Sequence, residues 1–368
     1  GYNLKDKSFD FKISALGGNS LLKEEVNFKD GDVFVDTVLF ETGETVQFAD
    51  IAPEAPVKAG YTFAGWADED GAIVTEGVIG SSCTYTAVYS LGVAKGATLS
   101  LDGDIGLNFY FEFPESGAEN AKVVLKAGDE ILNEISVADA PVKDGMYKFK
   151  ANVAAKDYEK QITATVEAGG KAETSRTYSA AEYIETVLSS EAEEFAAVRP
   201  LVGALQDYCE KAKAFFTGAE GAAAEHEEIT AETLSAFACS VSGTEPEGIT
   251  VYGPTLVLDS KTEIRFYFTA ESLDGIVCRA DGQEQTPESK ICEGVTYYYL
   301  SVKNVAAKDL DESHVFEIGN YSVSNYSALS YALAVLEEEA VDGNADVNLL
   351  NIVRAMVIYN TEADQYFS

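Results

Sequence analysis

Histidine is the side chain best suited to acid–base catalysis and metal binding near neutral pH, and only His226 and His314 occur in the 368 residues. His226 lies in the charged segment AAAEHEEIT, and His314 lies in DESHVF just before an expected strand. Neither has a second histidine at metal-site spacing, and neither stands near a strand-turn nucleophile motif. We therefore expect both histidines to be solvated, and the sequence predicts no catalytic residue, no metal site and no cofactor.

Other catalytic or ion-binding motifs are also weak. No Gly-rich loop is followed by Lys and Ser or Thr, as a phosphate cradle requires. The segment from Asp342 to Asn348 superficially resembles a calcium loop, but Val347 stands where Gly is needed and Val353 where a carboxylate is needed. We expect an ordinary turn between helices there. We therefore predict a protein that is not an enzyme. The one catalytic alternative is a glycosidase acting through two carboxylates, because a chain with 62 Asp and Glu residues offers many carboxylate pairs.

Tyrosines are the candidate ligand-binding residues. Tyr297, Tyr298 and Tyr299 are consecutive, so an extended chain must place their rings on both faces of a strand. Tyr110 and Tyr267 occupy equivalent positions in two similar strands, on the face opposite pairs of phenylalanines. Exposed rings would stack on sugars or anchor a protein partner. The alternative is that these tyrosines are half-buried fillers of the sheet.

The net charge limits the classes of partner, and the cysteines limit the possible disulfide bonds. A net charge of −36 repels phosphate backbones and anionic lipids, so we expect no nucleic-acid binding and no membrane insertion. Cys278 and Cys292 bracket a turn region and would form a disulfide only with Cα atoms roughly 4.4–6.8 Å apart; buried free thiols are the alternative. The chain opens on Gly1-Tyr2 without Met, so we expect that a targeting signal has been removed.

The elements that must position these residues come from a duplication. Thr98–Phe111 and Thr255–Phe268 are identical at seven of fourteen positions, and the segment VAAKD occurs at 153–157 and again at 305–309. Two further pairs of blocks follow in the same order: 178–188 with 326–336, and 201–216 with 352–367. The repeat is too long for a solenoid unit, so we expect two modules that fold as separate beads.

Each copy begins with strands and ends with helices. Leu107, Phe109 and Phe111 alternate with other residues, as a half-buried strand requires. Ser179 and Glu182 form a possible capping box, and apolar residues then recur at helical spacing up to Phe216 and again from 329 to 367. We predict an α+β, mainly β protein with an N-terminal β domain (1–90), copy 1 (91–218), and a linker with copy 2 (219–368). Residues 234–240 and 249–258 are the expected first strands of copy 2.

The N-terminal domain reads as short strands, among them Ser8–Ile13, Val33–Phe40, Tyr61–Trp66 and Cys83–Tyr89. The run from Pro53 to Trp66, PEAPVKAGYTFAGW, resembles the Listeria–Bacteroides repeat, the B-repeat of internalins. The resemblance covers about residues 38–89, although Leu39–Gly43 matches the usual first turn only loosely. It implies a small β-grasp-like domain of a bacterial surface protein, with Trp66 in its core.

The duplicated blocks, at about 91–218 and 234–368, resemble a module of extracellular proteins from gut Firmicutes. The motifs are Val153–Lys156, Tyr178–Tyr183 and Leu201–Phe216, with their counterparts in copy 2. This resemblance implies an extracellular, surface-attached location more than a reaction. We therefore expect a secreted, non-catalytic cell-surface protein that binds a host or bacterial surface protein. The alternatives are a polysaccharide-binding component of a glycan-degrading system and a structural spacer.

Overall fold

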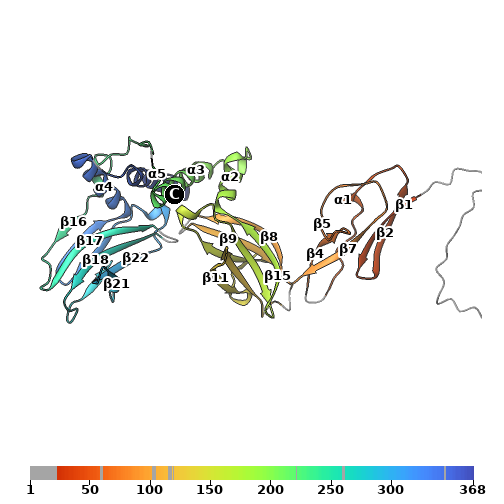
Figure 1. The fold of residues 1–368 in the computed structure, drawn as a ribbon, viewed down its shortest axis with the longest axis horizontal. Coiled ribbons are helices and arrows are strands. Elements are labelled where there is room, and N and C mark those ends of the chain that lie inside the picture. Colours follow the sequence, from red (N-terminus) through yellow and green to blue (C-terminus); the bar gives the residue numbers. More distant parts are fainter. Residues whose placement is uncertain are drawn as a thin grey trace, which may run out of the picture. The chain divides into compact units, whose positions relative to one another are not determined.

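The computed structural model describes residues 23–58, 61–101, 105–114, 118, 120–220, 222–258, 262–343 and 345–368 (Figure 1). The expected strand Ser8–Ile13 lies outside them. The protein is mainly β, with several small sheets and some helices, so the coarse fold class is confirmed. Contacts divide the chain into two compact units, Gly1–Val93 with Phe113–Ala118 and Ala94–Glu112 with Glu119–Ser368.

The first unit contains one mixed five-stranded sheet in the order β2-β1-β7-β4-β5 and a two-stranded sheet of β3 and β6. Strand β1 runs antiparallel to β2 and parallel to β7. The predicted strands at 33–40, 61–66 and 83–89 are confirmed as β2, β4 and β7. The elements are β1 (Lys23–Asp30), β2 (Val33–Glu41), β3 (Val46–Gln47), α1 (Phe48–Ile51), β4 (Thr62–Ala67), β5 (Ile73–Val74), β6 (Val78–Ile79) and β7 (Cys83–Ser90).

Aromatic rings fill the core of the first unit. Phe28 is fully buried and contacts Trp66 and Tyr85, with ring centroids 5.0 and 5.5 Å away. Trp66 also meets Phe63 edge to face. The expectation that Trp66 is a core residue is confirmed, because only 4% of its surface is exposed.

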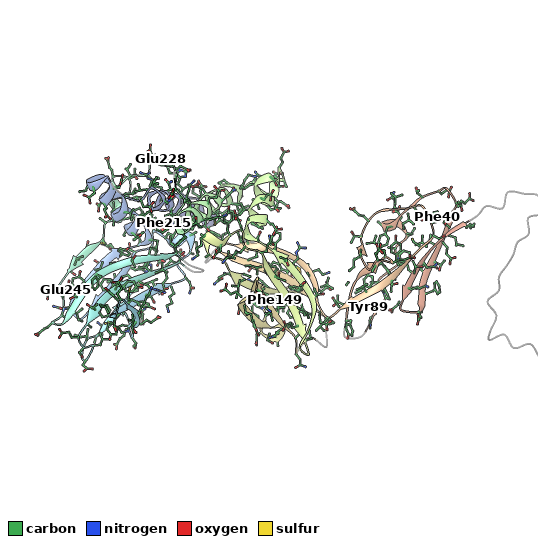
Figure 2. All side chains as sticks on the ribbon, in the orientation of Figure 1. Phe40, Tyr89, Phe149, Phe215, Glu228 and Glu245 are labelled. Carbon is green, nitrogen blue, oxygen red and sulfur yellow. The ribbon has the colours of Figure 1, made fainter. Side chains whose placement is uncertain are left out.

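Copy 1 consists of two four-stranded sheets, in the orders β11-β10-β14-β15 and β12-β13-β9-β8. The strands are β8 (Val93–Ser100), β9 (Gly106–Glu112), β10 (Lys122–Ala127), β11 (Glu130–Ser136), β12 (Val142–Lys143), β13 (Met146–Asn152), β14 (Ile162–Ala168) and β15 (Lys171–Tyr178). Short 3₁₀ turns η1 (Val137–Asp139) and η2 (Ala155–Asp157) connect them. Phe109, Phe111 and Phe149 are fully buried. Phe149 is labelled within copy 1 in Figure 2.

Copy 2 repeats this topology with one extra edge strand. Its sheets have the orders β16-β24-β23-β19-β20 and β17-β18-β22-β21. The strands are β16 (Ser240–Ser242), β17 (Ile249–Leu258), β18 (Thr262–Ala270), β19 (Cys278–Ala280), β20 (Gln283–Glu284), β21 (Glu288–Cys292), β22 (Val295–Lys303), β23 (His314–Ile318) and β24 (Tyr321–Tyr326). Phe266 of β18 stacks on Phe316 of β23 at 5.4 Å, so the two sheets face each other across a shared core.

Not every expected strand forms. Residues 249–258 form β17 as predicted. The expectation of a strand over 234–240 is wrong except at Ser240, where β16 begins, because residues 234–239 form turns and the 3₁₀ turn η4 (Ser235–Phe237). Leu234 is buried and packs against the core as part of that turn. The short apolar run at 234–239 therefore reflects burial of side chains in a turn, and not pairing with a neighbouring strand.

Two helices follow the sheets of each copy. They are α2 (Ala180–Ser189) and α3 (Arg199–Thr217), separated by η3 (Glu193–Phe195), and α4 (Ala328–Asp342) and α5 (Val347–Phe367). The 3₁₀ turn η5 (Ala307–Asp309) lies earlier, between β22 and β23. The predicted capping box at Ser179 is present, with Glu182 bonded back to the Ser179 backbone. The segment from 342 also forms the predicted turn, because Gly343 ends α4 and Asp346 caps α5.

The two copies share a core, so the expectation of separate beads is wrong. Helices α3 and α5 pack against each other (Figure 1), and one apolar cluster contains buried residues of both copies. Tyr208 and Tyr359, which are equivalent positions of the duplicated helix, stack on each other with centroids 5.5 Å apart and planes 17° apart. Buried residues of α3 and α5 therefore contact the other copy as well as their own, which the apolar pattern of each helix does not specify.

The linker between the copies is bound along α5. Three buried polar residues, spaced three apart on this helix, bond to the backbone of segment 219–229. The bonds run from Asn348 to Ala219 O (2.7 Å), from Asn351 to Ala223 O (2.8 Å), and from Arg354 to Glu225 O (3.2 Å) and Ile229 O (3.2 Å). The Glu225 N–H donates in turn to Asn351 Oδ1 at 2.9 Å. These bonds satisfy backbone groups that would otherwise lie unpaired beside a buried helix face.

All five cysteines lie within the described residues and are free thiols. Cys278 is buried on β19, whereas Cys292 is exposed at the end of β21 in the other sheet. The alternative of a bridge between them is therefore not formed. None of the helices in the described part of the chain has the length and apolar character to cross a membrane.

Candidate functional site

The structure divides the five candidate tyrosines between two places. Tyr110 lies on β9 of copy 1, where its hydroxyl meets Thr98 Oγ1 at 3.2 Å. Tyr298 points inward, is half-buried, and packs against the apolar core with its ring on Phe268 at 5.8 Å. Tyr267, Tyr297 and Tyr299 lie on the outer face of the sheet β17-β18-β22-β21, and this splitting of the triplet over two faces was predicted. Tyr267 and Tyr297 are half-buried there, and Tyr299 is buried, with 8% of its surface exposed.

The outer face of this sheet carries a cluster that we call the tyrosine–arginine face, made of Tyr252, Arg265, Tyr267, Tyr297 and Tyr299. Tyr267 and Tyr299 are cross-strand partners with ring centroids 5.3 Å apart. Tyr252 and Tyr297 form a second ring pair, also at 5.3 Å. The Arg265 guanidinium lies over the Tyr299 ring at 4.7 Å, a favourable cation–π distance.

Charged neighbours hold this face in place. Arg265 Nη2 lies 2.6 Å from Glu263 Oε2, and the Tyr299 hydroxyl donates to Glu288 Oε2 at 2.9 Å. Lys303 reaches the other oxygen of Glu288 at 2.6 Å. The hydrogen bonds from Lys303 and then Tyr299 lower the pKa of Glu288, while burial and then the bond to Glu288 raise the pKa of Tyr299. The rings are therefore fixed before a partner arrives, which lowers the entropy cost of binding.

We expect the Glu288 carboxyl to titrate below the ordinary pKa of glutamate and to move towards it in Lys303→Met, because the lysine bond that favours the charged form is lost. Since the folded-state pKa is lowered, the bond stabilises the fold above the unfolded-state pKa and is lost as the pH falls through the folded-state pKa. An NMR titration of the side-chain carboxyl carbon measures this, with Lys95→Met as the control. Equal midpoints in wild type and Lys303→Met would contradict the prediction.

Sequence reasoning missed Tyr252 and Arg265. Tyr252 precedes Gly253-Pro254, and Gly253 adopts a φ of +90° at a register shift of β17. This bulge leaves Tyr252 58% exposed beside Tyr297. Arg265 stands two residues before Tyr267 on β18, so strand periodicity alone places both on one face. The signal for Arg265 was therefore present in the sequence.

The shape of the tyrosine–arginine face limits what it can bind. The planes of Tyr267 and Tyr299 are inclined by 47°, and those of Tyr252 and Tyr297 by 59°. The rings therefore do not form the flat platform on which consecutive sugar rings would stack. Tyrosine and arginine together are typical of the anchor residues of protein interfaces.

Copy 1 lacks this cluster at the equivalent positions. Tyr110 corresponds to Tyr267, but Asn108 stands in place of Arg265 and Lys148 in place of Tyr299. Tyr110 therefore lies in a different copy from the other candidates, and its neighbours are an asparagine and a lysine in place of an arginine and a tyrosine. The structure brings three of the five candidates together and leaves out Tyr110 and Tyr298.

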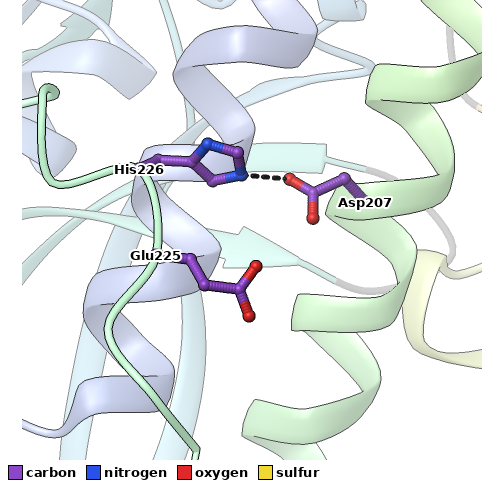
Figure 3. A group of neighbouring side chains, drawn as sticks. All are labelled: Asp207, Glu225 and His226. Atoms are coloured by element: carbon purple, nitrogen blue, oxygen red, sulfur yellow. Dashed lines mark hydrogen bonds and ion pairs between the residues drawn. The ribbon is translucent and has the colours of Figure 1, made fainter.

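The expectation that both histidines are solvated is wrong. His314 is buried, and its Nδ1 lies 2.9 Å from Asp281 Oδ2. His226 Nε2 lies 2.8 Å from Asp207 Oδ2, and Glu225 completes a group of three side chains with metal-ligand character (Figure 3). The binding of segment 219–229 to α5 brings His226 and Glu225 towards α3.

Lys211 neutralises this group without a metal. Its ammonium lies 2.7 Å from Glu225 Oε2 and 3.4 Å from Asp207 Oδ1, and the side chain is largely buried. A divalent cation at the same carboxylates would face a fixed positive charge a few ångströms away. We therefore read the ion pairs of Lys211 with Asp207 and Glu225, together with the hydrogen bond between His226 and Asp207, as contacts that tie the linker to α3.

No model of a known protein family and no curated protein matches the chain. Among the solved structures that match in the comparison of folds are two titin fragments. One is a three-Ig structure of titin domains I67–I69 carrying Glu-to-Ala mutations, at 10% identity over 83% of this chain and 94% of that one, with a TM-score of 0.18. The other is the titin I-band fragment I67–I69, at 9% identity over 82% and 95%, also with a TM-score of 0.18. At that score the likeness supports no conclusion on function.

Proposed function

We propose that this chain is a non-catalytic adhesion protein that binds a surface protein of a host or of another bacterium through the tyrosine–arginine face. The observation that carries the proposal is the presence of two tyrosine pairs on one face of a sheet, with Arg265 held over a ring of one pair. Tyrosine contributes a large, rigid contact area at low entropy cost, and arginine adds directed hydrogen bonds.

The location is part of the proposal: secreted, and attached to the bacterial cell surface. Its support is the run PEAPVKAGYTFAGW and the resemblance of both copies to an extracellular Firmicutes module. We also propose that the first unit is a β-grasp-like B-repeat domain. A mixed sheet with β1 parallel to β7, and a core built around Trp66, is consistent with that identification.

Polysaccharide binding is the second candidate. It is favoured by the exposure of Tyr252 and its contact with Tyr297, and disfavoured by the inclination of the rings. A curved or branched glycan would suit inclined rings better than a flat one. A purely structural spacer would need no such cluster, because aromatic rings on the outer face of a sheet do not increase the distance that the module spans.

The test is a binding measurement with the double variant Tyr252→Ser/Tyr297→Ser. Binding of the labelled chain to mucus- or serum-coated surfaces and to a glycan array is compared with that of the wild type. If the face is an interface, the double variant should lose about 30-fold in affinity for the protein-coated surface, since removal of a central anchor costs about 2 kcal/mol.

Tyr110→Ser is the matched control, because it removes the equivalent of Tyr267 from copy 1, where the cluster is not formed. Binding to glycans alone, with the same sensitivity to the double variant, would favour the polysaccharide candidate. Equal binding of the wild type and the double variant to every surface would refute a role for this face.

A further inference from the structure

Copy 1 contains a groove of about 800 Å³ along one edge of its sandwich, between β11 and β13. The residues that matter for its chemistry are Ile131, Ile135, Asn133, Lys148, Lys150 and Lys160. Its volume lies within the range typical of small-molecule sites, about 300–1,000 Å³. The groove lies in a different copy from the tyrosine–arginine face.

The groove is open because β12 covers only the beginning of β13. Strand β12 pairs with Met146 and Tyr147, after which the edge of β13 has no partner strand. Asn133 of β11 bridges the gap once, donating to Lys150 O at 3.3 Å. A gap that one side chain spans is too narrow for an added strand, so the groove suits a small molecule better than an extended peptide.

The charge of the groove contrasts with that of the chain. Three lysines and two carboxylates, Glu130 and Asp157, line it, although the whole chain carries a net charge of −36. Within the described residues, Lys148 has no ion-pair partner, and Lys160 pairs only with Asp157 at 3.1 Å. The Lys150 side chain instead lies over Gly106 of β9, where a Cβ would be 2.0 Å from its Cε. Lys148 and Lys160 are thus the cations available to a ligand.

The floor of the groove is apolar. Ile131 is 52% exposed there, although isoleucine is normally buried. Ile135 and Ile162 line the same groove. An apolar ligand body would therefore cover surface that is left open to water in the free protein.

The second copy closes the corresponding edge. Gln285 pairs with both backbone groups of Ser301, donating to its carbonyl at 3.1 Å and accepting from its N–H at 3.2 Å. The positions of Lys148, Lys150 and Lys160 are held by Tyr299, Ser301 and Glu312. The open edge and its positive charge thus belong to copy 1 alone, although the corresponding strands have the same order in both copies.

We propose that this groove binds a small amphipathic carboxylate, with the apolar body over Ile131 and Ile135 and the carboxylate held by Lys148 and Lys160. Both parts of the ligand are required by the lining. A neutral apolar molecule would offer no charge to Lys148 and Lys160, of which only Lys160 has an ion-pair partner, Asp157, in the part of the chain that the structure describes. A wholly polar anion would leave the isoleucines exposed to water.

Titration calorimetry of the whole chain with sodium octanoate tests the proposal, with octanol and glucuronate as the matched neutral and polar probes. We expect octanoate to bind at least about tenfold more tightly than either, and Lys148→Gln/Lys160→Gln to weaken octanoate binding about tenfold. Lys95→Gln, the same charge change on β8 of the same copy, should leave binding within about twofold of wild type.

NMR amide shifts locate the site independently of affinity. Octanoate should move the amides of Ile131 and Lys150 and leave those of Tyr267 and Tyr299 unchanged. No binding of octanoate, preference for glucuronate or octanol, or equal loss in the Lys95 control would each overturn the proposal.

Discussion

Tyr359→Ala is expected to destabilise both copies together, by about 3–5 kcal/mol, as large-to-small changes at buried aromatics do. The ring is 4% exposed and stacks on Tyr208 of the other copy, so its loss opens a cavity on the joint surface of α3 and α5. Urea unfolding followed by far-UV circular dichroism measures the change. Hydrogen exchange should show that protection falls in α3 as well as in α5.

The chain provides an internal control for this experiment. Its single tryptophan, Trp66, lies in the first unit, so tryptophan fluorescence reports a core that Tyr359 does not touch. The fluorescence transition should stay at the same urea concentration in the variant. Loss of protection confined to α4 and α5, with α3 unchanged, would mean that the copies are independent after all.

Arg354→Met is expected to cost about 2–4 kcal/mol and to release segment 219–229 from α5. Methionine keeps the apolar stem but removes the donors for Glu225 O and Ile229 O, and a buried acceptor left unpaired costs about 1–3 kcal/mol. Limited digestion with a glutamate-specific protease measures the release, because Glu225, Glu227 and Glu228 lie in this segment. Cleavage there should become many times faster than in wild type.

Arg176→Met is the matched control, since Arg176 lies on β15 over the ring of Tyr178 and does not touch the linker. Unchanged cleavage in Arg354→Met, together with unchanged unfolding, would show that the remaining asparagine bonds suffice. In that case Asn348, Asn351 and Arg354 would bind the linker independently of one another.

The sequence predicted local structure well where a period or a cap carried the signal. Phe266 and Phe268 face inward while Tyr267 faces outward, as alternation requires. Ser179 caps α2 through Glu182. These features depend on residues close in the chain, so one sequence contains all the information needed.

Contacts between distant segments could not be read in the same way. The apolar stripe of residues 201–216 predicts that α3 packs on something, but not that its partner is the equivalent helix of the other copy. His226 looked solvated because its neighbours in sequence are charged and small. Its partner on α3, Asp207, and the neighbouring pair of Lys211 with Glu225 come together only when the linker contacts both α3 and α5.

The same limit applies to the candidate site. Tyr299 was predicted as one ring of a triplet, yet its environment is set by Arg265 and Glu288 on neighbouring strands. Strand register decides which side chains of different strands meet, and a bulge such as that at Gly253 changes it locally. Tyr252 entered the cluster through that bulge.

The stacking of Tyr208 on Tyr359 has a consequence for how many copies can assemble. When equivalent residues of two copies meet each other, the contact is isologous, and each partner uses the same patch that it offers. Such a contact is saturated by two members and cannot propagate in either direction. Further modules joined to this chain would have to attach by linkers or other faces, so the natural building block is the pair rather than the single copy.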